Sequence, residues 1–352
     1  MGRPIPEIEK EALDGAFMEP YLQLVISRRY GDDVSIQSLE TAPIKRGVFR
    51  YCIQMNGAHS EEPPLSIIGK VFDEEDAGKA AFDKMRQLWE SGFPENDPLR
   101  VRIPYAFYFL SELRLLLMEA APGTPLKKLV KKQKATAADM TGFAETLAKL
   151  HSTALAFGEP FTVEKHLSVR CGDLVEPMAT EFPEIAEDLR GIVDAALKYQ
   201  SQNTAQDFTL AHGDFHLSQV HAHHDDLWLL DIDPLHFGDP AYDVAMVLFM
   251  LKQESAKRGT GAYINSLRDV FIDTYFSKMN WEIARRIPLQ EAMINLKRAC
   301  KRYRWQDEDG WQEILPKQVQ QAVTCMEAMG KFPALENRAD LVEIYEHCPG
   351  SE

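Results

Sequence analysis

The sequence predicts an α+β protein with a small β-rich lobe followed by a larger, mainly helical lobe. Short β-type runs dominate residues 35–118, the segment Pro122-Gly123-Thr124-Pro125 ends that pattern, and apolar residues at helical spacing dominate the remainder of the chain. Strands and helices do not alternate as they would in a doubly wound sheet. We therefore expect a helical segment at residues 1–34, a sheet lobe with one helix at 35–121, and a helical lobe at 122–352.

The elements of the small lobe follow from residue spacing. Apolar residues at near-helical intervals predict one or two helices between residues 6 and 29. A helix is also expected at Asp76–Glu90, where alanines, Met85 and Leu88 fall on one side. Strands are predicted at Ser35–Leu39, Val48–Gln54, Leu65–Phe72, Ile103–Leu110 and Leu113–Met118.

The large lobe is expected to be helical apart from one hairpin at Val220–Asp231. The residues Met140, Phe143, Leu147 and Leu150 predict a helix over Ala138–Ala156. Similar periodicity predicts helices at 183–200, 241–256, 261–279, 287–304 and 316–330.

Composition narrows the functional class. The chain has 352 residues and a formal net charge of −15, which argues against binding to nucleic acid or to anionic lipid. The five cysteines are scattered without a C-x-x-C pair, which is typical of neither a disulfide framework nor a zinc module. No leader peptide and no apolar run of membrane-spanning length is recognisable, so we expect a cytoplasmic protein.

The strongest chemical signal is a set of linked acidic motifs in the large lobe. His212-Gly213-Asp214-Phe215-His216-Leu217-Ser218-Gln219 is followed by Leu230-Asp231-Ile232-Asp233 and then by Gly238-Asp239-Pro240-Ala241-Tyr242-Asp243. A hairpin between the first two blocks would bring two carboxylates and an amide together at one end of the hairpin. Such oxygen ligands suit Mg²⁺. Phosphoryl transfer requires a metal ion that neutralises the phosphate charge and a separate carboxylate that orients the attacking hydroxyl. For any single aspartate of these motifs, the alternative to a metal or catalytic role is that its side chain caps a turn or a helix.

These blocks resemble the aminoglycoside phosphotransferase and choline kinase-like family, which has H-G-D-x-H-x-x-N, an I-D-x-D type strand end and G-D-P-x-x-D at the same spacing. The resemblance implies a bilobal protein-kinase-like fold with Asp214 as catalytic base. It implies Asp231 and Gln219 as metal ligands, with Asp233 as the substitute ligand, and structural roles for Asp239 and Asp243. Gln219 stands where the family usually has Asn, so the chain is expected to represent a glutamine variant.

The resemblance also implies a nucleotide site in the small lobe. Lys70 lies within an apolar strand, and a half-buried lysine needs an anion, here nucleotide phosphates and a helix carboxylate. Asp83 is the expected carboxylate, with Glu75 as the alternative. Gly47 is expected in a phosphate-covering loop, although an ordinary hairpin turn fits equally well, and backbone groups of Glu119 and Ala121 are expected to face adenine.

The expected activity is transfer of the γ-phosphoryl group of Mg-bound ATP, or of GTP, to a hydroxyl of a small molecule. A nucleotide-binding module with weak or no catalysis and a regulatory role remains an alternative, as does a metal-dependent phosphohydrolase. The acceptor stays open between an aminoglycoside, a sugar, an amino alcohol and a homoserine-like metabolite, and the oligomeric state stays open as well. Acceptor contacts are expected from residues 261–330 and from the insertion at 158–207.

Overall fold

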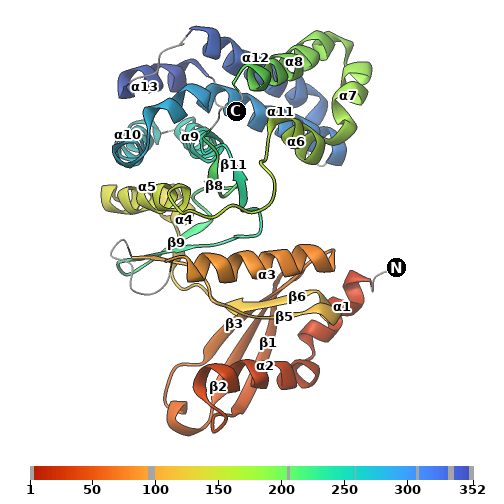
Figure 1. Cartoon of the computed structure of the whole chain (residues 1–352), viewed down its shortest axis with the longest axis vertical. Coiled ribbons are helices and arrows are strands. Elements are labelled where there is room, and N and C mark those ends of the chain that lie inside the picture. Colours follow the sequence, from red (N-terminus) through yellow and green to blue (C-terminus); the bar gives the residue numbers. More distant parts are fainter. Residues whose placement is uncertain are drawn as a thin grey trace. The chain divides into compact units, whose positions relative to one another are not determined.

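The computed structural model describes residues 4–93, 100–203, 207–257, 259–306, 309–331 and 337–348. The chain forms two compact units, Met1–Gly123 with His221–Pro234 and Thr124–Val220 with Leu235–Glu352. The first is built on an antiparallel sheet and the second is mainly helical (Figure 1). The α+β fold class with a β-rich first lobe is therefore confirmed.

The first unit contains a five-stranded antiparallel sheet in the order β1-β2-β3-β6-β5. Its strands are β1 (Ile36–Lys45), β2 (Val48–Met55), β3 (Leu65–Val71), β5 (Ala106–Leu110) and β6 (Leu115–Glu119), and its helices are α1 (Ile5–Leu13), α2 (Gly15–Tyr30) and α3 (Glu75–Glu90). β1 lies at the edge of this sheet, which explains how it accommodates Pro43, a residue without a backbone N–H.

Helices cover both faces of this sheet, with α2 on one side and α3 on the other (Figure 1). Side chains alternate along β2, so that Phe49, Tyr51 and Ile53 share a buried core with residues of α1 and α2. The segment expected as a separate helical region at 1–34 is thus part of the core of the first unit. On the opposite face, Gly78 of α3 packs so close to Phe109 that an added Cβ would lie 2.5 Å from the ring.

The strand predicted over Ile103–Leu110 is divided in the structure. β4 (Val101–Arg102) belongs to another sheet, in which it pairs in parallel with β10 (Asp226–Leu229), and β5 begins only at Ala106. Pro104 lies between the two strands, and because proline cannot donate to a sheet ladder, it separates them.

The hairpin of β9 (Val220–His223) and β10 belongs largely to the first unit, because residues 221–234 cluster with Met1–Gly123. Leu227 and Trp228 pair with Val101 and Arg102, and Arg102 is ion-paired to Asp226. The sequence-based division at residue 122 assigned this hairpin to the large lobe. The difference arises because strand pairing to β4 is not encoded in the local pattern of residues 220–231.

The second unit consists mostly of helices. They are α4 (Leu126–Lys131), α5 (Ala137–His151), α6 (Val163–His166), α7 (Val175–Glu181), α8 (Ala186–Gln202), α9 (Ala241–Ser255), α10 (Gly261–Lys278), α11 (Ile287–Trp305), α12 (Trp311–Lys331) and α13 (Arg338–His347). Short strands β7 (Thr124–Pro125), β8 (Thr209–Ala211) and β11 (His236–Gly238) accompany them, and β8 pairs antiparallel with β11.

Aromatic side chains tie these helices to the β8–β11 ribbon. Phe143 of α5 stacks on Phe215, which follows β8, at a centroid distance of 4.6 Å, and lies 6.0 Å from Phe271 of α10. All three rings are fully buried. The loop after β8 is thereby fixed to the helical core by its own apolar residue.

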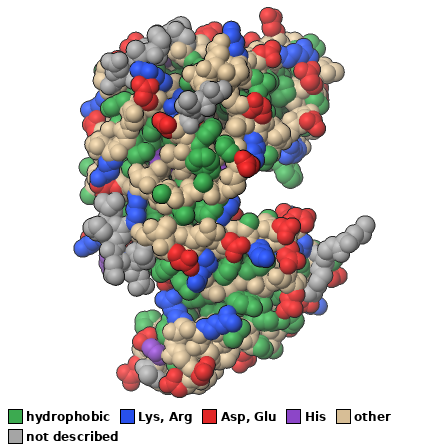
Figure 2. All heavy atoms as spheres, in the orientation of Figure 1, with side chains coloured by type: hydrophobic (Ala, Val, Ile, Leu, Met, Phe, Trp, Pro, Cys, Tyr) green, Lys and Arg blue, Asp and Glu red, His purple; other side chains and the backbone are tan. Residues whose placement is uncertain are grey.

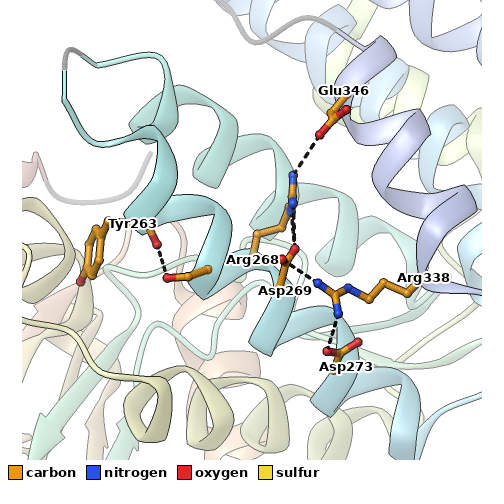
Figure 3. A network of polar contacts seen from close by, with 7 residues as sticks. Tyr263, Arg268, Asp269, Asp273, Arg338 and Glu346 are labelled. Carbon is orange, nitrogen blue, oxygen red and sulfur yellow. Dashed lines mark hydrogen bonds and ion pairs between the residues drawn. The ribbon is translucent and has the colours of Figure 1, made fainter.

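The last helix, α13, was not predicted from the sequence, and a polar network joins it to α10 (Figure 3). Arg268 contacts Asp269 and Glu346, while Arg338 contacts Asp269 and Asp273. Arg268 is only 5% exposed and its guanidinium lies 4.7 Å from the centre of the Tyr345 ring. The network therefore includes a buried cation as well as surface ion pairs.

Acidic and basic side chains are interspersed over the drawn face of each unit rather than gathered into one patch (Figure 2). Among the helices of the described residues, none has the length and hydrophobicity needed to cross a lipid bilayer.

Candidate functional site

The 212–219 loop begins where β8 ends. His236 of β11 pairs with Ala211 of β8, so the ribbon fixes the start of the loop. Gly213 has a φ of +79°, and an added Cβ there would lie 2.6 Å from the His236 ring. A glycine is required at this position for both reasons, which gives the G of the motif a structural explanation.

Asp243, near the start of α9, holds the beginning of this loop. Its Oδ2 accepts the backbone N–H of His212 at 2.6 Å, and its Oδ1 accepts that of Gly213 at 2.8 Å. His151 Nε2 also lies 3.1 Å from Oδ2, and Nδ1 of the same ring lies 2.7 Å from the Tyr275 hydroxyl. Burial opposes ionisation of Asp243, but the hydrogen bond and charge of His151 outweigh it and lower the pKa to about 2.

Asp239 has a second structural role. It accepts the backbone N–H of Ala241 at 3.0 Å at the start of α9, and it is ion-paired to Arg286 Nε at 3.0 Å. Gln290 donates to it at 2.9 Å. These contacts support the structural roles expected for Asp239 and Asp243.

Arg170 braces the same loop from the insertion between α5 and β8. Its guanidinium donates to the Gly213 carbonyl oxygen at 2.8 Å and to the Tyr242 hydroxyl at 2.6 Å, and it lies over the Phe161 and Tyr242 rings. Sequence reasoning missed this residue, because no local pattern connects it with a loop more than forty positions later.

Asp214 and His216 lie on the exposed side of the loop. The Asp214 carboxylate is 36% exposed, and its Oδ2 lies 3.7 Å from His216 Nε2, beyond the range of a hydrogen bond. His216 Nδ1 accepts the backbone N–H of Ser218. Burial lowers the pKa of His216, although the Asp214 carboxylate opposes this effect. Asp214 is therefore an accessible acceptor for a proton or a hydrogen bond.

An open pocket of about 310 Å³ begins at these two residues. α9 contributes the apolar side chains Met246, Phe249 and Met250, and α11 contributes Ile294, Lys297, Arg298, Lys301 and Arg302. The spacing K-R-x-x-K-R along α11 is visible in the sequence and could have identified these basic residues, since positions four apart share a helix face.

In the first unit, Lys70 joins two of the predicted metal ligands. Its Nζ lies 2.8 Å from Asp231 Oδ1 and also contacts Asp233 Oδ2. Burial opposes the charge of Lys70, but Asp233 and Asp231 outweigh it and raise its pKa. Asp231 has a φ of +56°, a conformation that costs a non-glycine residue about 1–3 kcal/mol and is concentrated at functional sites.

The expected ion pair between Lys70 and Asp83 is not formed among the residues that the structure describes. Asp83 is exposed, because the buried face of α3 is formed by Ala81, Met85 and Leu88. The next residue, Lys84, instead turns inward and donates to the Asp233 backbone oxygen at 2.8 Å. Glu75, the alternative, is exposed as well. Lys84 is a residue that sequence reasoning missed.

Gly47 lies in a tight turn rather than in an open loop. Lys45 pairs with Val48, so that Arg46 and Gly47 alone connect β1 to β2. The Gly47 N–H donates to a carboxylate oxygen of Glu9 at 2.8 Å, and its carbonyl oxygen accepts from Val71 N–H. Of the two alternatives considered, these contacts favour the ordinary hairpin turn.

The predicted hinge residues Glu119 and Ala121 lie at the end of β6 (Leu115–Glu119) and two positions beyond it. The N–H of Glu119 donates to the Tyr105 carbonyl oxygen and that of Ala120 donates to Ser66. The N–H of Ala121 has no acceptor within the described part of the chain. Gly123 then takes a φ of +89° and lies against the Ala222 backbone.

Gln219 is half-buried at the end of its loop, and its N–H donates to His216 O at 2.8 Å. Its side chain offers an amide oxygen, and Asp231 and Asp233 in the first unit offer carboxylate oxygens. Each of these ligand types fits Mg²⁺ or Ca²⁺ and not a soft metal. A different cluster, Glu291, Cys325 and Cys348, is compact and buried, but Lys252 Nζ lies 2.5 Å from Glu291 Oε1. All three side chains are buried in the helical core, and we regard the cluster as structural.

Comparisons with known proteins identify a family and a fold. The model of the phosphotransferase enzyme family (APH) matches residues 73–285, which is more than half of the chain. The search of curated proteins found no significant match.

Solved structures resemble the chain over most of its length. An ethanolamine kinase from Plasmodium vivax shares 12% identity with a TM-score of 0.59, covering 92% of this chain and 95% of its own. A choline/ethanolamine kinase family protein from Mesorhizobium loti shares 11% with a TM-score of 0.54, covering 93% and 99%. An amicoumacin kinase in complex with AMP-PNP, Ca²⁺ and Ami shares 11% with a TM-score of 0.58, covering 90% and 95%. At these identities the likeness shows the fold.

Proposed function

Because this chain belongs to the phosphotransferase enzyme family, we propose that it transfers the γ-phosphoryl group of ATP to a hydroxyl group of a small molecule. The observation that carries the proposal is the convergence of Lys70 with Asp231 and Asp233, residues more than 160 positions apart. A half-buried ammonium beside two carboxylates is the charge arrangement that a metal–nucleotide complex requires.

Asp214 is the proposed base. It is exposed at the mouth of a pocket, and Asp243, Arg170 and His236 fix the loop on which it lies. In the proposed step the acceptor oxygen forms a bond to the γ-phosphorus while the bond from that phosphorus to the β,γ-bridging oxygen breaks. The hydroxyl proton passes to Asp214, and ADP leaves. Such catalysis rests on positioning and electrostatics rather than on a covalent enzyme intermediate.

The nucleotide and metal have their own proposed ligands. Lys70 would contact the α- and β-phosphate oxygens, and backbone groups of Glu119 and Ala121 would face the base. Asp231 and Gln219 are the proposed metal ligands, with Asp233 as the substitute, because their oxygen atoms suit Mg²⁺. When bound, the metal neutralises charge on the phosphates. Backbone recognition of the base leaves GTP as an alternative donor.

The decisive experiment incubates the protein with Mg-ATP, or with Mg-GTP, and a panel of hydroxyl compounds, and detects an added phosphoryl group by mass spectrometry. We expect Asp214→Asn to lower the transfer rate by about 10²–10⁴-fold while nucleotide affinity stays within about threefold. Asp194→Asn, at an exposed position on α8, is the control and should leave transfer unchanged. Near-normal turnover by Asp214→Asn would refute the proposed role of Asp214.

A nucleotide-binding module with little catalysis is the second candidate. It is favoured by Gln219 in place of Asn and by the Gly47 N–H, which Glu9 already occupies. Binding of Mg-ATP in a thermal-shift assay, without slow ATP hydrolysis and without transfer to any acceptor, would support this alternative and contradict the enzymatic proposal.

A further inference from the structure

The pocket beside Asp214 has an unusual charge distribution. Asp214 is the one carboxylate among the described residues that line it, whereas α11 supplies four basic side chains on two successive turns. They are Lys297, Arg298, Lys301 and Arg302. The protein as a whole carries a net charge of −15, so this concentration of positive charge runs against its average composition.

The basic residues are not simply solvated. Lys297 and Arg298 are half-buried, Arg298 lies over the Phe249 ring at 4.8 Å, and Arg302 Nε donates to Gln318 at 3.1 Å. These contacts fix the two guanidinium groups, whereas Lys301 is exposed at the rim. Cations held in place beside apolar methionine and phenylalanine side chains form a subsite of the kind that orients a small ligand.

Lys297 shows that the pocket is short of negative charge. Burial and the nearby Arg170 lower its pKa to about 8, although Asp214 opposes them, and Lys301 adds to the lowering. An ammonium group that is half-buried among other cations is costly, and an anionic ligand would offset that cost.

From this arrangement we propose that the acceptor is an anionic hydroxyl compound whose carboxylate or phosphate binds Lys297 and Lys301 while its hydroxyl meets Asp214. This inference rests on the proposed function, because it assigns the pocket beside Asp214 to the acceptor. It excludes polycationic acceptors such as aminoglycosides, since four cations would repel them. The volume of about 310 Å³ is at the small end for ligand pockets and suits a monosaccharide-sized molecule.

The test uses sets of acceptors that share a skeleton and differ in charge. One set is glucose, gluconate, glucose 6-phosphate and glucosamine, and the other is glycerol, glycerate and glycerol 3-phosphate. Each is assayed for phosphoryl transfer from Mg-ATP and, without nucleotide, for binding by calorimetry. We expect the anionic members to bind and react best, and the carboxylate and phosphate arms separate the two sources of negative charge.

Lys301→Glu then tests the subsite itself. Because Lys301 is exposed, the substitution should not affect folding. We expect its KM for the anionic acceptor to rise at least about tenfold, with KM for ATP and turnover of the neutral analogue within about threefold. Lys317→Glu, which makes the same charge change at an exposed position of α12 outside the pocket, should behave like the unmodified protein.

The outcomes separate the two proposals. Transfer confined to neutral or cationic acceptors, or a rise of KM for ATP instead of the acceptor in Lys301→Glu, would overturn the anionic subsite and leave the phosphotransferase proposal intact. If no acceptor is phosphorylated, calorimetry still decides the subsite. Anion binding that Lys301→Glu abolishes would support it, and equal or absent binding of charged and neutral compounds would overturn it.

Discussion

Single residues around the 212–219 loop act through buried hydrogen bonds. The carboxylate of Asp243 fixes two consecutive N–H groups of the loop and is itself held by His151. An Asp at this position is therefore part of the scaffold on which Asp214 is presented. The last residue of the motif G-D-P-x-x-D thus holds the first residues of the H-G-D motif by hydrogen bonds.

Asp243 should make the fold sensitive to acid. Its pKa of about 2 lies below the ordinary value of 3.8, so its contribution is complete above pH 4 and is lost as the pH falls towards 2. The shift corresponds to about 2 kcal/mol. In urea unfolding, the gap in free energy of unfolding between the unmodified protein and Asp243→Asn should shrink by that amount between pH 4 and pH 2. A gap that stays constant over this range would show that Asp243 has no depressed pKa.

A side chain at Gly123, at the end of the continuous segment Met1–Gly123 of the first unit, should cause a steric clash. With a φ of +89° and a Cβ position only 2.2 Å from the Ala222 oxygen, Gly123→Ala should cost about 2 kcal/mol or more. Gly191 is the matched control, because it lies within helix α8 and a Cβ there would meet none of the described residues within 4 Å. Gly191→Ala should stabilise the protein by about 0.5–1 kcal/mol. Thermal unfolding of both variants would reveal the opposite signs, and equal effects would contradict the prediction.

At the scale of elements, the helices and most strands could be predicted because their apolar periodicity is local. Helix α13 was missed although Asn337 caps it and Leu341, Ile344 and Tyr345 follow at helical spacing, because the signal covers only ten residues. The division between β4 and β5 has a non-local cause, since their separate partners lie elsewhere in the chain. The pairing of β10 with β4 likewise has no signature within the hairpin.

The candidate site shows the same division. Lys70, Asp231, Asp233 and Asp214 could be selected from the sequence because their motifs are contiguous, and the structure brings Lys70 together with Asp231 and Asp233. Asp83 is exposed and does not pair with Lys70, because Lys84, the next residue of α3, turns inward instead. A shift of one residue changes the helix face, and the sequence did not determine it. Arg170 and the basic face of α11 act through tertiary contacts, and only the repeated K-R spacing of α11 gave a local signal.

The network between α10 and α13 predicts unequal costs for its two arginines. Arg268 is buried against Tyr345, so Arg268→Ala should lower the free energy of unfolding by about 2 kcal/mol through lost packing and unpaired carboxylates. Arg338 is 44% exposed, and Arg338→Ala should cost under about 1 kcal/mol, less still in high salt. Urea unfolding midpoints at low and high salt would measure the stability loss of both variants. A larger loss for Arg338→Ala than for Arg268→Ala would contradict the prediction.

At the scale of the whole molecule, ligand binding should raise the free energy of unfolding. Mg-ATP at about 100 times its Kd should stabilise the protein by about 2.7 kcal/mol, and removal of the metal with EDTA should abolish most of that gain. Thermal shift is the measurement. Lys70→Met should lose the shift, whereas Asp214→Asn should keep it, because only Lys70 is assigned to the phosphates. A shift that survives in both EDTA and Lys70→Met would argue against the proposed nucleotide site.

The chain passes between its two units three times, since residues 221–234 return to the first unit before the polypeptide continues into the second. Splitting the gene after codon 123 would therefore not produce two self-sufficient halves. The downstream product would carry Leu227 and Trp228 without β4, which pairs with them, and the upstream product would retain Lys70 without its aspartates. Either fragment expressed alone should aggregate, and recovery of a folded protein should require both polypeptides to be synthesised together.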